Sequence, residues 1–262
     1  MKKLVMLFAA ITVVLFGCKK SDSTETTEVT CKLLKAVTTT NGTTVSTYYT
    51  FDNSGKLSLV KEQTGAADTS LVRKYNYTGN EFSFSNWSDN SGNSDTIYYA
   101  YDASKRIMQT LKHHHSGGIT LNIVTNYTYN STNQVIRTVA KSTTDYINYT
   151  TDSTIYNYAK SNVSDYAQFT KVGNAGWSTY RVKLGYDDKK NYYKTTGEPQ
   201  ISYLYWSANN LLGYYNPDST NAYKAINFSD YTGTGYPQTF IYSFRPDQPN
   251  THISGSLTYK CQ

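Results

Sequence analysis

The sequence predicts an all-β protein: an antiparallel up-and-down meander of repeated hairpins that forms a strongly curved or closed barrel-like sheet. Three observations support this prediction. The chain of 262 residues contains 27 Tyr and is rich in Thr, Ser and Asn, residues that favour strands and turns. A strand–turn–strand pattern recurs along most of the chain. Two cysteines, Cys31 and Cys261, stand at the two ends of the patterned region.

The repeated unit is clearest at residues 96–111. Tyr99 and Tyr101 share one face of a strand, residues 102–105 turn the chain, and Ile107 begins the return. Alternating side chains on both sides of a short turn are typical of an antiparallel hairpin.

Degenerate copies of this unit follow one another at intervals of 24 to 29 residues, which indicates one repeated supersecondary unit. Later copies are expected to turn at residues 187–190 and, after a strand at 201–205, at residues 207–210. The aromatic residues that mark the copies are Phe51, Tyr77, Tyr101, Tyr129, Tyr158 and Tyr186.

The fourth position of these turns favours residues that accept a positive φ. Gly55, Asn133 and Asn209 stand there in three copies, and Gly and Asn adopt this conformation at least cost. Lys105 and Lys190 stand there in two others and are less favourable. The pattern therefore predicts tight hairpin turns, more strongly for the first three than for the last two.

The amino terminus is typical of an export signal. Lys2 and Lys3 precede a thirteen-residue apolar run, too short to span a bilayer, and Leu15-Phe16-Gly17-Cys18 resembles the bacterial lipobox. By that resemblance residues 1–17 are a lipoprotein signal peptide and Cys18 is lipidated. An ordinary signal peptide with an incidental cysteine is the alternative.

After Cys18, residues 18–30 are predicted to be a flexible tether, because they are polar and charged with almost no large apolar side chain. Lys19-Lys20-Ser21-Asp22 resembles the export signals of Bacteroidetes surface lipoproteins. We therefore expect an outer-membrane lipoprotein, on the cell surface or on the periplasmic face, whose partner through Cys18 is the membrane. Residues 31–262 are predicted to form a single repeat-built β domain.

Cys31 and Cys261 are predicted to form a disulfide, because an exported protein meets an oxidising compartment and the pair is even. Two free thiols are the alternative. A disulfide requires Cα atoms within about 7 Å. The first and last strands would then be neighbours, which suggests that the sheet curls until its ends meet.

Two resemblances extend this interpretation. The Tyr-x-Tyr-Asp hairpins resemble the tyrosine–aspartate repeats of Rhs-type shell proteins. The lipobox, the hairpin from Phe51 to Leu57, Gly185 to Asn191 and Trp206 to Asn210 more closely resemble Bacteroidetes lipoproteins of unknown function with a porin-like fold. The sequence departs from that pattern at Tyr192-Tyr193. This resemblance implies a curved β meander and an exported lipoprotein, and it carries over no catalytic residue.

Polar clusters offer little chemistry. His113, His114 and His115 are adjacent, so on a strand they cannot all face one ion; we interpret them as a solvated hairpin tip rather than a metal site. Asp187 and Asp188 are interpreted as turn formers rather than a carboxylate pair. The sequence holds no nucleophile-elbow, zinc-protease or phosphate-loop motif. No catalytic residue, metal or cofactor is predicted.

Paired tyrosines are the remaining signal. They recur at i and i+2 on successive strands, so each pair shares a face and neighbouring pairs form cross-strand ladders. Their main role is predicted to be core packing, while a groove lined by the exposed rings is the best candidate binding site. The candidate ligand-binding aromatics are Tyr99, Tyr101, Tyr127, Tyr129 and Trp206.

Two functions stay open from the sequence. The first is a non-catalytic binding or structural module with a glycan or protein ligand, and the second is a polysaccharide-processing enzyme with carboxylates on adjacent strands. A membrane-spanning barrel is disfavoured because polar residues occupy too many strand positions. Nucleic-acid binding is excluded, since the formal charge of +6 falls to +4 without Lys2 and Lys3 and no basic stripe is present. Any localised function is expected where the repeats are irregular, at the histidines and after Pro199.

Overall fold

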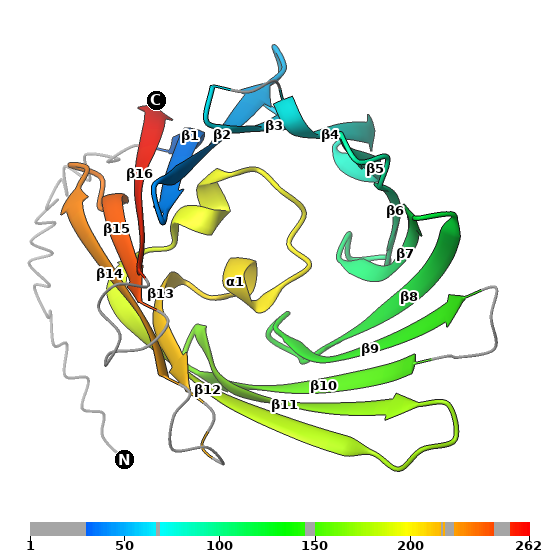
Figure 1. Ribbon diagram of the computed structural model, residues 1–262. Helices are drawn as coiled ribbons and strands as arrows, with labels where there is room; N and C mark the ends of the chain where they lie inside the picture. Colours follow the sequence, from blue (N-terminus) through cyan, green and yellow to red (C-terminus); the bar gives the residue numbers. More distant parts are fainter. Residues whose placement is uncertain (1–29, 67–68, 145–149, 216, 218–222, 244–251) are drawn as a thin grey trace, which may run out of the picture.

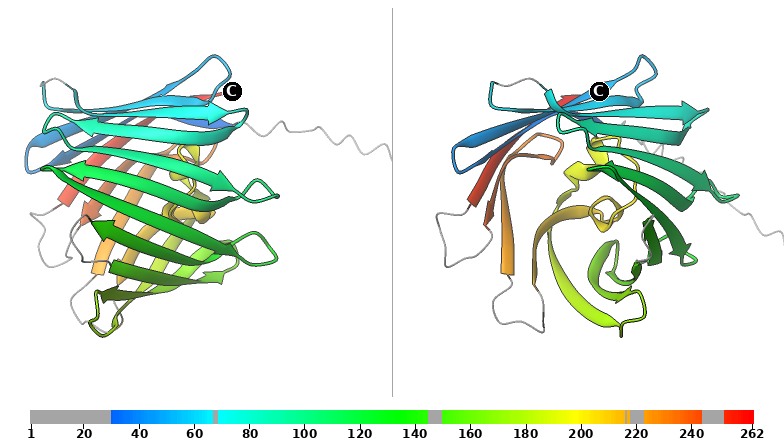
Figure 2. Two further views of the ribbon diagram at one scale, coloured as in Figure 1. Left: turned by 90° about the vertical axis from the view of Figure 1, so that its right-hand side faces the viewer. Right: turned by 45° about the vertical axis from the view of Figure 1, so that its right-hand side comes forward.

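Antiparallel strands close into a barrel in the computed structural model, which describes residues 30–66, 69–144, 150–215, 217, 223–243 and 252–262 (Figure 1). Each strand pairs with its neighbours in sequence, and β1 pairs with β16. Figure 2 shows the strands inclined side by side around the wall. Within the described residues the sixteen strands are β1 (Cys31–Thr40), β2 (Thr43–Phe51), β3 (Leu57–Thr64), β4 (Thr69–Thr78), β5 (Glu81–Asp89), β6 (Ser94–Tyr101), β7 (Ile107–Ser116), β8 (Ile119–Tyr129), β9 (Val135–Thr144), β10 (Thr150–Ala159), β11 (Asn162–Val172), β12 (Ser178–Lys190), β13 (Asn209–Tyr215), β14 (Tyr223–Tyr231), β15 (Pro237–Ser243) and β16 (His252–Cys261).

The barrel closes at the seam between β1 and β16. Cys31 lies directly opposite Cys261 in the strand register, and a disulfide joins them with their Cα atoms 4.0 Å apart. The predicted all-β meander, its closure and this disulfide are confirmed.

Tight turns at one end of the barrel follow from side-chain capping. The side-chain Oδ1 atoms of Asp52, Asp102 and Asn130 each accept hydrogen bonds from the backbone N–H groups two and four residues later, at 2.9 to 3.0 Å. The fourth turn position has positive φ, as predicted, at Gly55 and also at Lys105. We call this end, with the turns at 52–56, 102–106, 130–134 and 232–236, the turn end, and the opposite one the loop end.

The repeat fails between β12 and β13. Residues 187–190 belong to β12 rather than to the predicted turn, and residues 201–205 do not form the predicted strand. Residues 191–208 instead enter the interior of the barrel, where they form the 3₁₀ turn η1 (Tyr192–Thr195) and the short helix α1 (Tyr203–Trp206). Figure 1 shows this luminal segment inside the ring of strands.

The pairing register separates the two faces of the wall. Tyr75 faces inward, because its hydroxyl contacts the luminal segment, so its neighbours Lys74 and Asn76 face outward. Lys74 pairs directly with Asn86, and Asn86 with Thr96, so these residues share the outer face. Among the described residues, neither helical segment is long and apolar enough to cross a membrane.

The best-packed part of the interior lies where the luminal segment meets β2 to β5. Leu57, Val60 and Tyr75 are buried there and form one cluster. The segment approaches closely at Gly197, whose φ is 75°. A Cβ atom at this position would lie 3.1 Å from the ring of Phe51, so glycine is required for both conformation and space. This core fixes the luminal segment against one side of the wall.

Candidate functional site

Two buried asparagines hold the base of the luminal segment. Asn191 caps η1 by accepting a hydrogen bond from the N–H of Tyr193 at 3.0 Å, and its amide donates to the carbonyls of Leu204 and Ser207. Asn210 accepts from the N–H of Tyr192 at 2.9 Å. Both asparagines are almost fully buried, at 2 % and 0 % exposure, so the segment begins and ends at fixed points.

Further hydrogen bonds tie the end of the segment to the barrel wall. The Ser207 hydroxyl donates to the Tyr186 hydroxyl at 2.9 Å and accepts from the N–H of Val163 at 3.2 Å. The side-chain oxygen of Asn162 accepts from the N–H groups of Ala208 and Asn209. Because neighbouring strands supply these partners, the segment is built into the wall rather than lying loosely in the lumen.

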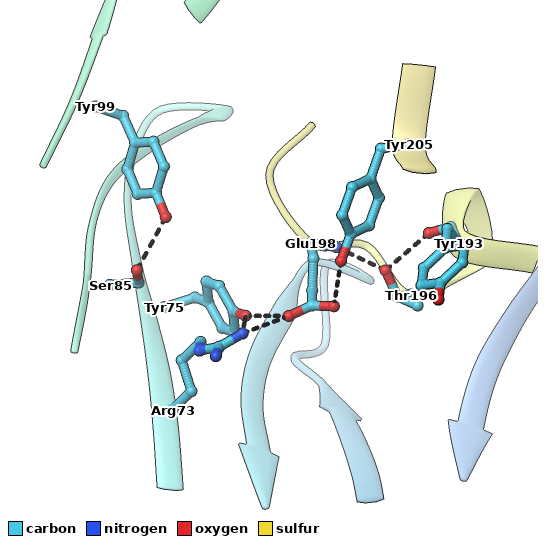
Figure 3. A network of polar contacts seen from close by, with 8 residues as sticks. All are labelled: Arg73, Tyr75, Ser85, Tyr99, Tyr193, Thr196, Glu198 and Tyr205. Carbon is cyan, nitrogen blue, oxygen red and sulfur yellow. Dashed lines mark hydrogen bonds and ion pairs between the residues drawn. The ribbon is translucent and has the colours of Figure 1, made fainter. Parts of the chain in front are cut away.

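Glu198 fastens the middle of the luminal segment to β4 (Figure 3). Its Oε1 accepts hydrogen bonds from Arg73 Nη1 and from the Tyr75 hydroxyl, both at 2.8 Å, and its Oε2 accepts from the Tyr205 hydroxyl at 2.7 Å. Burial and the nearby carboxylate of Glu198 raise the pKa of Tyr75 and of Tyr205 above the ordinary value. Both tyrosines therefore stay protonated donors at neutral pH.

Between the luminal segment and the wall of β5 to β10 lies a cavity of about 650 Å³ at the turn end. We call it the turn-end cavity. Several aromatic rings and many polar groups line it together. The lining residues are Asn80, Glu81, Phe82, Tyr101, Ser104, Lys105, Arg106, Ile107, Tyr129, Asn133, Gln134, Val135, Tyr158, Tyr193, Lys194, Gly197, Glu198, Pro199, Gln200, Tyr205 and Trp206.

The luminal segment brings Trp206 to the predicted aromatic ladder. The Trp206 ring packs edge-on against Tyr127 and Tyr156, with centroid distances of 6.4 and 5.0 Å, and its Nε1 donates to the Gln200 carbonyl. Tyr101 and Tyr129, predicted as ligand-binding aromatics, line the turn-end cavity with Trp206. Burial raises the pKa of Tyr101 to about 12.

The other two predicted aromatics face the lumen without lining this cavity. Tyr99 shares a hydrogen bond of 2.9 Å with Ser85, whose partner across β4 is Tyr75, so both lie on the inner face. Tyr127 packs against the ring of Trp206, which lines the cavity. The ladder thus supports the cavity, and its residues nearest the turn end form the lining.

The histidines lie within β7 and not at a hairpin tip, so that interpretation is wrong; the turn itself is formed by Gly117 and Gly118. His113 bonds Asn122, whereas His114 bonds Asp95, which also forms an ion pair with Lys112 at 2.7 Å. Adjacent strand residues alternate between faces, as expected. No group of three or more metal-ligating side chains lies within the described residues.

Asp187 has a structural role, although not in the turn that was predicted. It accepts hydrogen bonds from the backbone N–H groups of Lys189 and Asn210 and from the Asn210 amide, all at 2.9 to 3.0 Å. Asp188 instead faces solvent and forms an ion pair with Lys189. The two carboxylates make no pair. Cys18 lies outside the described residues.

Comparisons with known proteins identify the architecture. No protein-family model and no curated protein matches the chain. Solved structures do match, among them a porin-like protein from Bacteroides uniformis ATCC 8492, at 9 % identity, and one from Bacteroides vulgatus ATCC 8482, at 12 %. Each alignment has a TM-score of 0.56 and covers 87 % of this chain and 98 % of the other. The chain shares their fold.

Sequence reasoning missed the two residues that organise the site. Arg73 reads as an ordinary strand position, and Glu198 lies in a stretch interpreted as a connection before a strand. The available signal was Gly197-Glu198-Pro199, an acidic residue between two residues that interrupt strands, in the irregular region where function was expected. The partner on β4 is 125 residues away, so only the closed fold brings the two together.

Proposed function

We propose that the protein is an exported lipoprotein, held at the outer membrane through Cys18, whose barrel binds a carbohydrate in the turn-end cavity without chemical conversion. The cavity carries this proposal. It offers the rings of Trp206, Tyr101 and Tyr129 beside amide and charged groups from Gln134 and Arg106. Sugar rings have apolar faces that stack on aromatic side chains and hydroxyls that need hydrogen-bond partners, so the lining matches both.

The outer face supports a barrel in water beside the membrane, rather than one that crosses it. A membrane barrel needs an outward apolar band. Here polar rows interrupt the apolar ones: one outward row across neighbouring strands reads Lys74, Asn86, Thr96 and His113, and it lies beside the row of Phe84, Tyr98, Leu111 and Val124. Ile155 faces outward, with 42 % exposure, because its neighbour Tyr156 packs inward on Trp206. Ala167 pairs directly with both Ile155 and Arg181, so Arg181 also faces outward. A lipid on Cys18 would supply the membrane attachment that such a face does not.

The alternative, a polysaccharide-processing enzyme, requires two carboxylates at the ligand. Glu81 and Glu198 both line the turn-end cavity. Both oxygens of Glu198 already accept hydrogen bonds from Arg73, Tyr75 and Tyr205. A carboxylate held in this way is suited to fixing the segment rather than to exchanging protons with a substrate.

A glycan panel tests the function. The mature chain is titrated with oligosaccharides by calorimetry, and products are followed by chromatography. Trp206→Ala should weaken binding at least about tenfold, because it removes a stacking ring. The matched control Trp177→Ala, at an exposed tryptophan, should leave binding unchanged. Saturable binding without product supports the proposal; released product supports the enzyme, and no binding across the panel overturns the proposal.

The anchor has its own test. Cells that express the chain are fed a labelled fatty acid, and the protein is isolated from separated membranes. The wild type should carry label in the outer-membrane fraction, and Cys18→Ala should carry none. Label that persists in Cys18→Ala contradicts lipidation at this residue. Protease treatment of intact cells then distinguishes the cell surface from the periplasmic face.

A further inference from the structure

A second cavity lies on the other side of the luminal segment. It has a volume of about 350 Å³, and we call it the loop-end cavity, because its walls include Tyr214, Tyr242 and Ile253, next to the loop-end termini of β13, β15 and β16. Tyr193 lines both cavities and is their common wall. The full lining is Thr38, Tyr192, Tyr193, Tyr203, Leu204, Leu211, Tyr214, Ile226, Phe228, Phe240, Tyr242 and Ile253.

The two cavities differ in chemistry. Arg106, Lys194 and Glu198 are among the charged side chains at the turn-end cavity. By contrast, aromatic and aliphatic residues make up the loop-end cavity apart from Thr38, and none of the residues that line it is charged. The hydroxyls of Tyr214 and Tyr242 lie 3.3 Å apart and bond to each other. Such a lining favours a neutral apolar ligand over water or an ion.

Close packing fixes the wall of the loop-end cavity. Tyr192 stacks on Tyr193 with a centroid distance of 4.2 Å, and Tyr192 also contacts Phe228 at 5.8 Å. Phe228 packs on Phe240 at 6.3 Å. The Phe240 ring lies over Gly255, where any Cβ atom would collide with the ring and with the backbone of β1. These rings are held in place by their neighbours, so this wall of the cavity is preformed.

We propose that the loop-end cavity binds a small neutral apolar molecule, as a ligand distinct from the carbohydrate of the turn-end cavity. An apolar cavity of about 150 Å³ accommodates benzene, so this one, roughly twice as large, fits a molecule of about two aromatic rings or a chain of about ten carbons. Transfer of such a molecule from water into an apolar wall is favourable by about 25 cal/mol per Å² of buried area. Charged ligands would lose their hydration without gaining a partner.

The test uses N-phenyl-1-naphthylamine, a neutral two-part aromatic whose fluorescence rises in apolar surroundings, with the mature chain. We expect saturable binding at one site per chain, displacement by decan-1-ol, and at least about tenfold weaker displacement by decanoate, since a carboxylate must be desolvated. Tyr129→Ala, on the wall strand β8, changes the lining of the turn-end cavity alone and should leave the affinity for the probe unchanged.

Two isoleucines give a matched pair of variants. Ile226 on β14 lines the cavity, whereas Ile241 on β15 faces outward with 48 % exposure. Ile226→Phe adds volume inside and should weaken probe binding about tenfold or more, while Ile241→Phe should not. If Ile226→Phe fails to fold, Ile226→Ala, which enlarges the space, should bind the probe with changed affinity. The proposal is overturned if the probe does not saturate, if both isoleucine positions respond equally, or if the oligosaccharides displace the probe.

Discussion

At the residue scale, Glu198 is the side chain that holds the luminal segment in its place. It is 12 % exposed, and its three donors come from β4 and from α1. A partly buried carboxylate is stable only while hydrogen bonds replace its lost hydration. The Thr196 hydroxyl also accepts the N–H of Glu198 at 3.2 Å, so the backbone at this residue is fixed with its side chain.

Replacement of Glu198 by Gln should lower the free energy of unfolding by about 2 kcal/mol, because two charge-assisted hydrogen bonds weaken and Arg73 loses its ionic partner. Urea denaturation measures this change. The control is Glu81→Gln, a carboxylate of the same cavity outside this network, and it should cost much less. Arg73→Met combined with Glu198→Gln should cost less than the sum of the single changes. Additive losses would show that the pair is not coupled.

At the element scale, the hairpin turns follow a local rule that the sequence displays. An Asp or Asn opens the turn, accepts two backbone N–H groups and is followed by a residue with positive φ. The hydrogen bond from the Arg106 side chain, with two from the backbone, holds the pKa of Asp102 below its ordinary value. These contacts are all within five residues, which is why hairpins such as that at 96–111 could be predicted.

Lys105 is the residue that fits this rule least. It adopts a φ of 62° where Gly stands in the equivalent turn of β2 and β3. Lys105→Gly should therefore stabilise the protein by about 1 kcal/mol, since an L side chain in the left-handed region costs about that amount. The midpoint of thermal unfolding measures this stabilisation. The matched control Ser104→Gly, one residue earlier, should destabilise the protein, and a stabilisation at both positions would contradict the argument.

The luminal segment could not be predicted by the same reasoning. Ile201, Tyr203 and Tyr205 alternate as a strand does, and this alternation led to the predicted seventh hairpin. The environment inside the barrel overrides that local preference, because side chains on every face of the segment are partly buried there. A short helix capped by Ser202 forms its own backbone hydrogen bonds and packs on all sides. The turn-end cavity depends on this segment. From the sequence, therefore, only three of the residues that line the cavity could be named: Tyr101 and Tyr129 on the barrel wall, and Trp206.

At the scale of the whole molecule, the disulfide closes a loop that contains almost the entire barrel. Cys31 and Cys261 are 230 residues apart in sequence and directly paired in the sheet. By the chain-entropy model, replacing both with Ser should lower the free energy of unfolding by about 5 kcal/mol. The barrel should still close, because backbone pairing between β1 and β16 remains. Denaturant unfolding measures the loss of stability, and circular dichroism shows whether the β structure is kept. An unchanged unfolding midpoint would contradict the expected contribution of the disulfide.

The tyrosine-lined interior also sets how the whole barrel responds to alkali. Burial raises the pKa of Tyr99, Tyr101 and Tyr127 to about 12, against about 10 for an exposed tyrosine in the unfolded chain. Between these values the unfolded chain releases protons that the folded barrel keeps, so the unfolded state binds fewer protons and stability falls as pH rises. Below pH 10 both states hold these protons, and this contribution to stability does not vary.

We therefore expect the free energy of unfolding to decrease steadily from pH 10 to pH 12, with a steeper slope than the titration of Lys and exposed Tyr alone would give. Denaturant titrations at fixed pH measure the slope, and absorbance at 295 nm reports tyrosinate. Replacing Tyr99 and Tyr127 by Phe should make the slope shallower, because two protons no longer distinguish the states. A wild-type slope that is flat across this range, or a slope unaffected by the two replacements, would mean that the interior tyrosines ionise as freely as exposed ones.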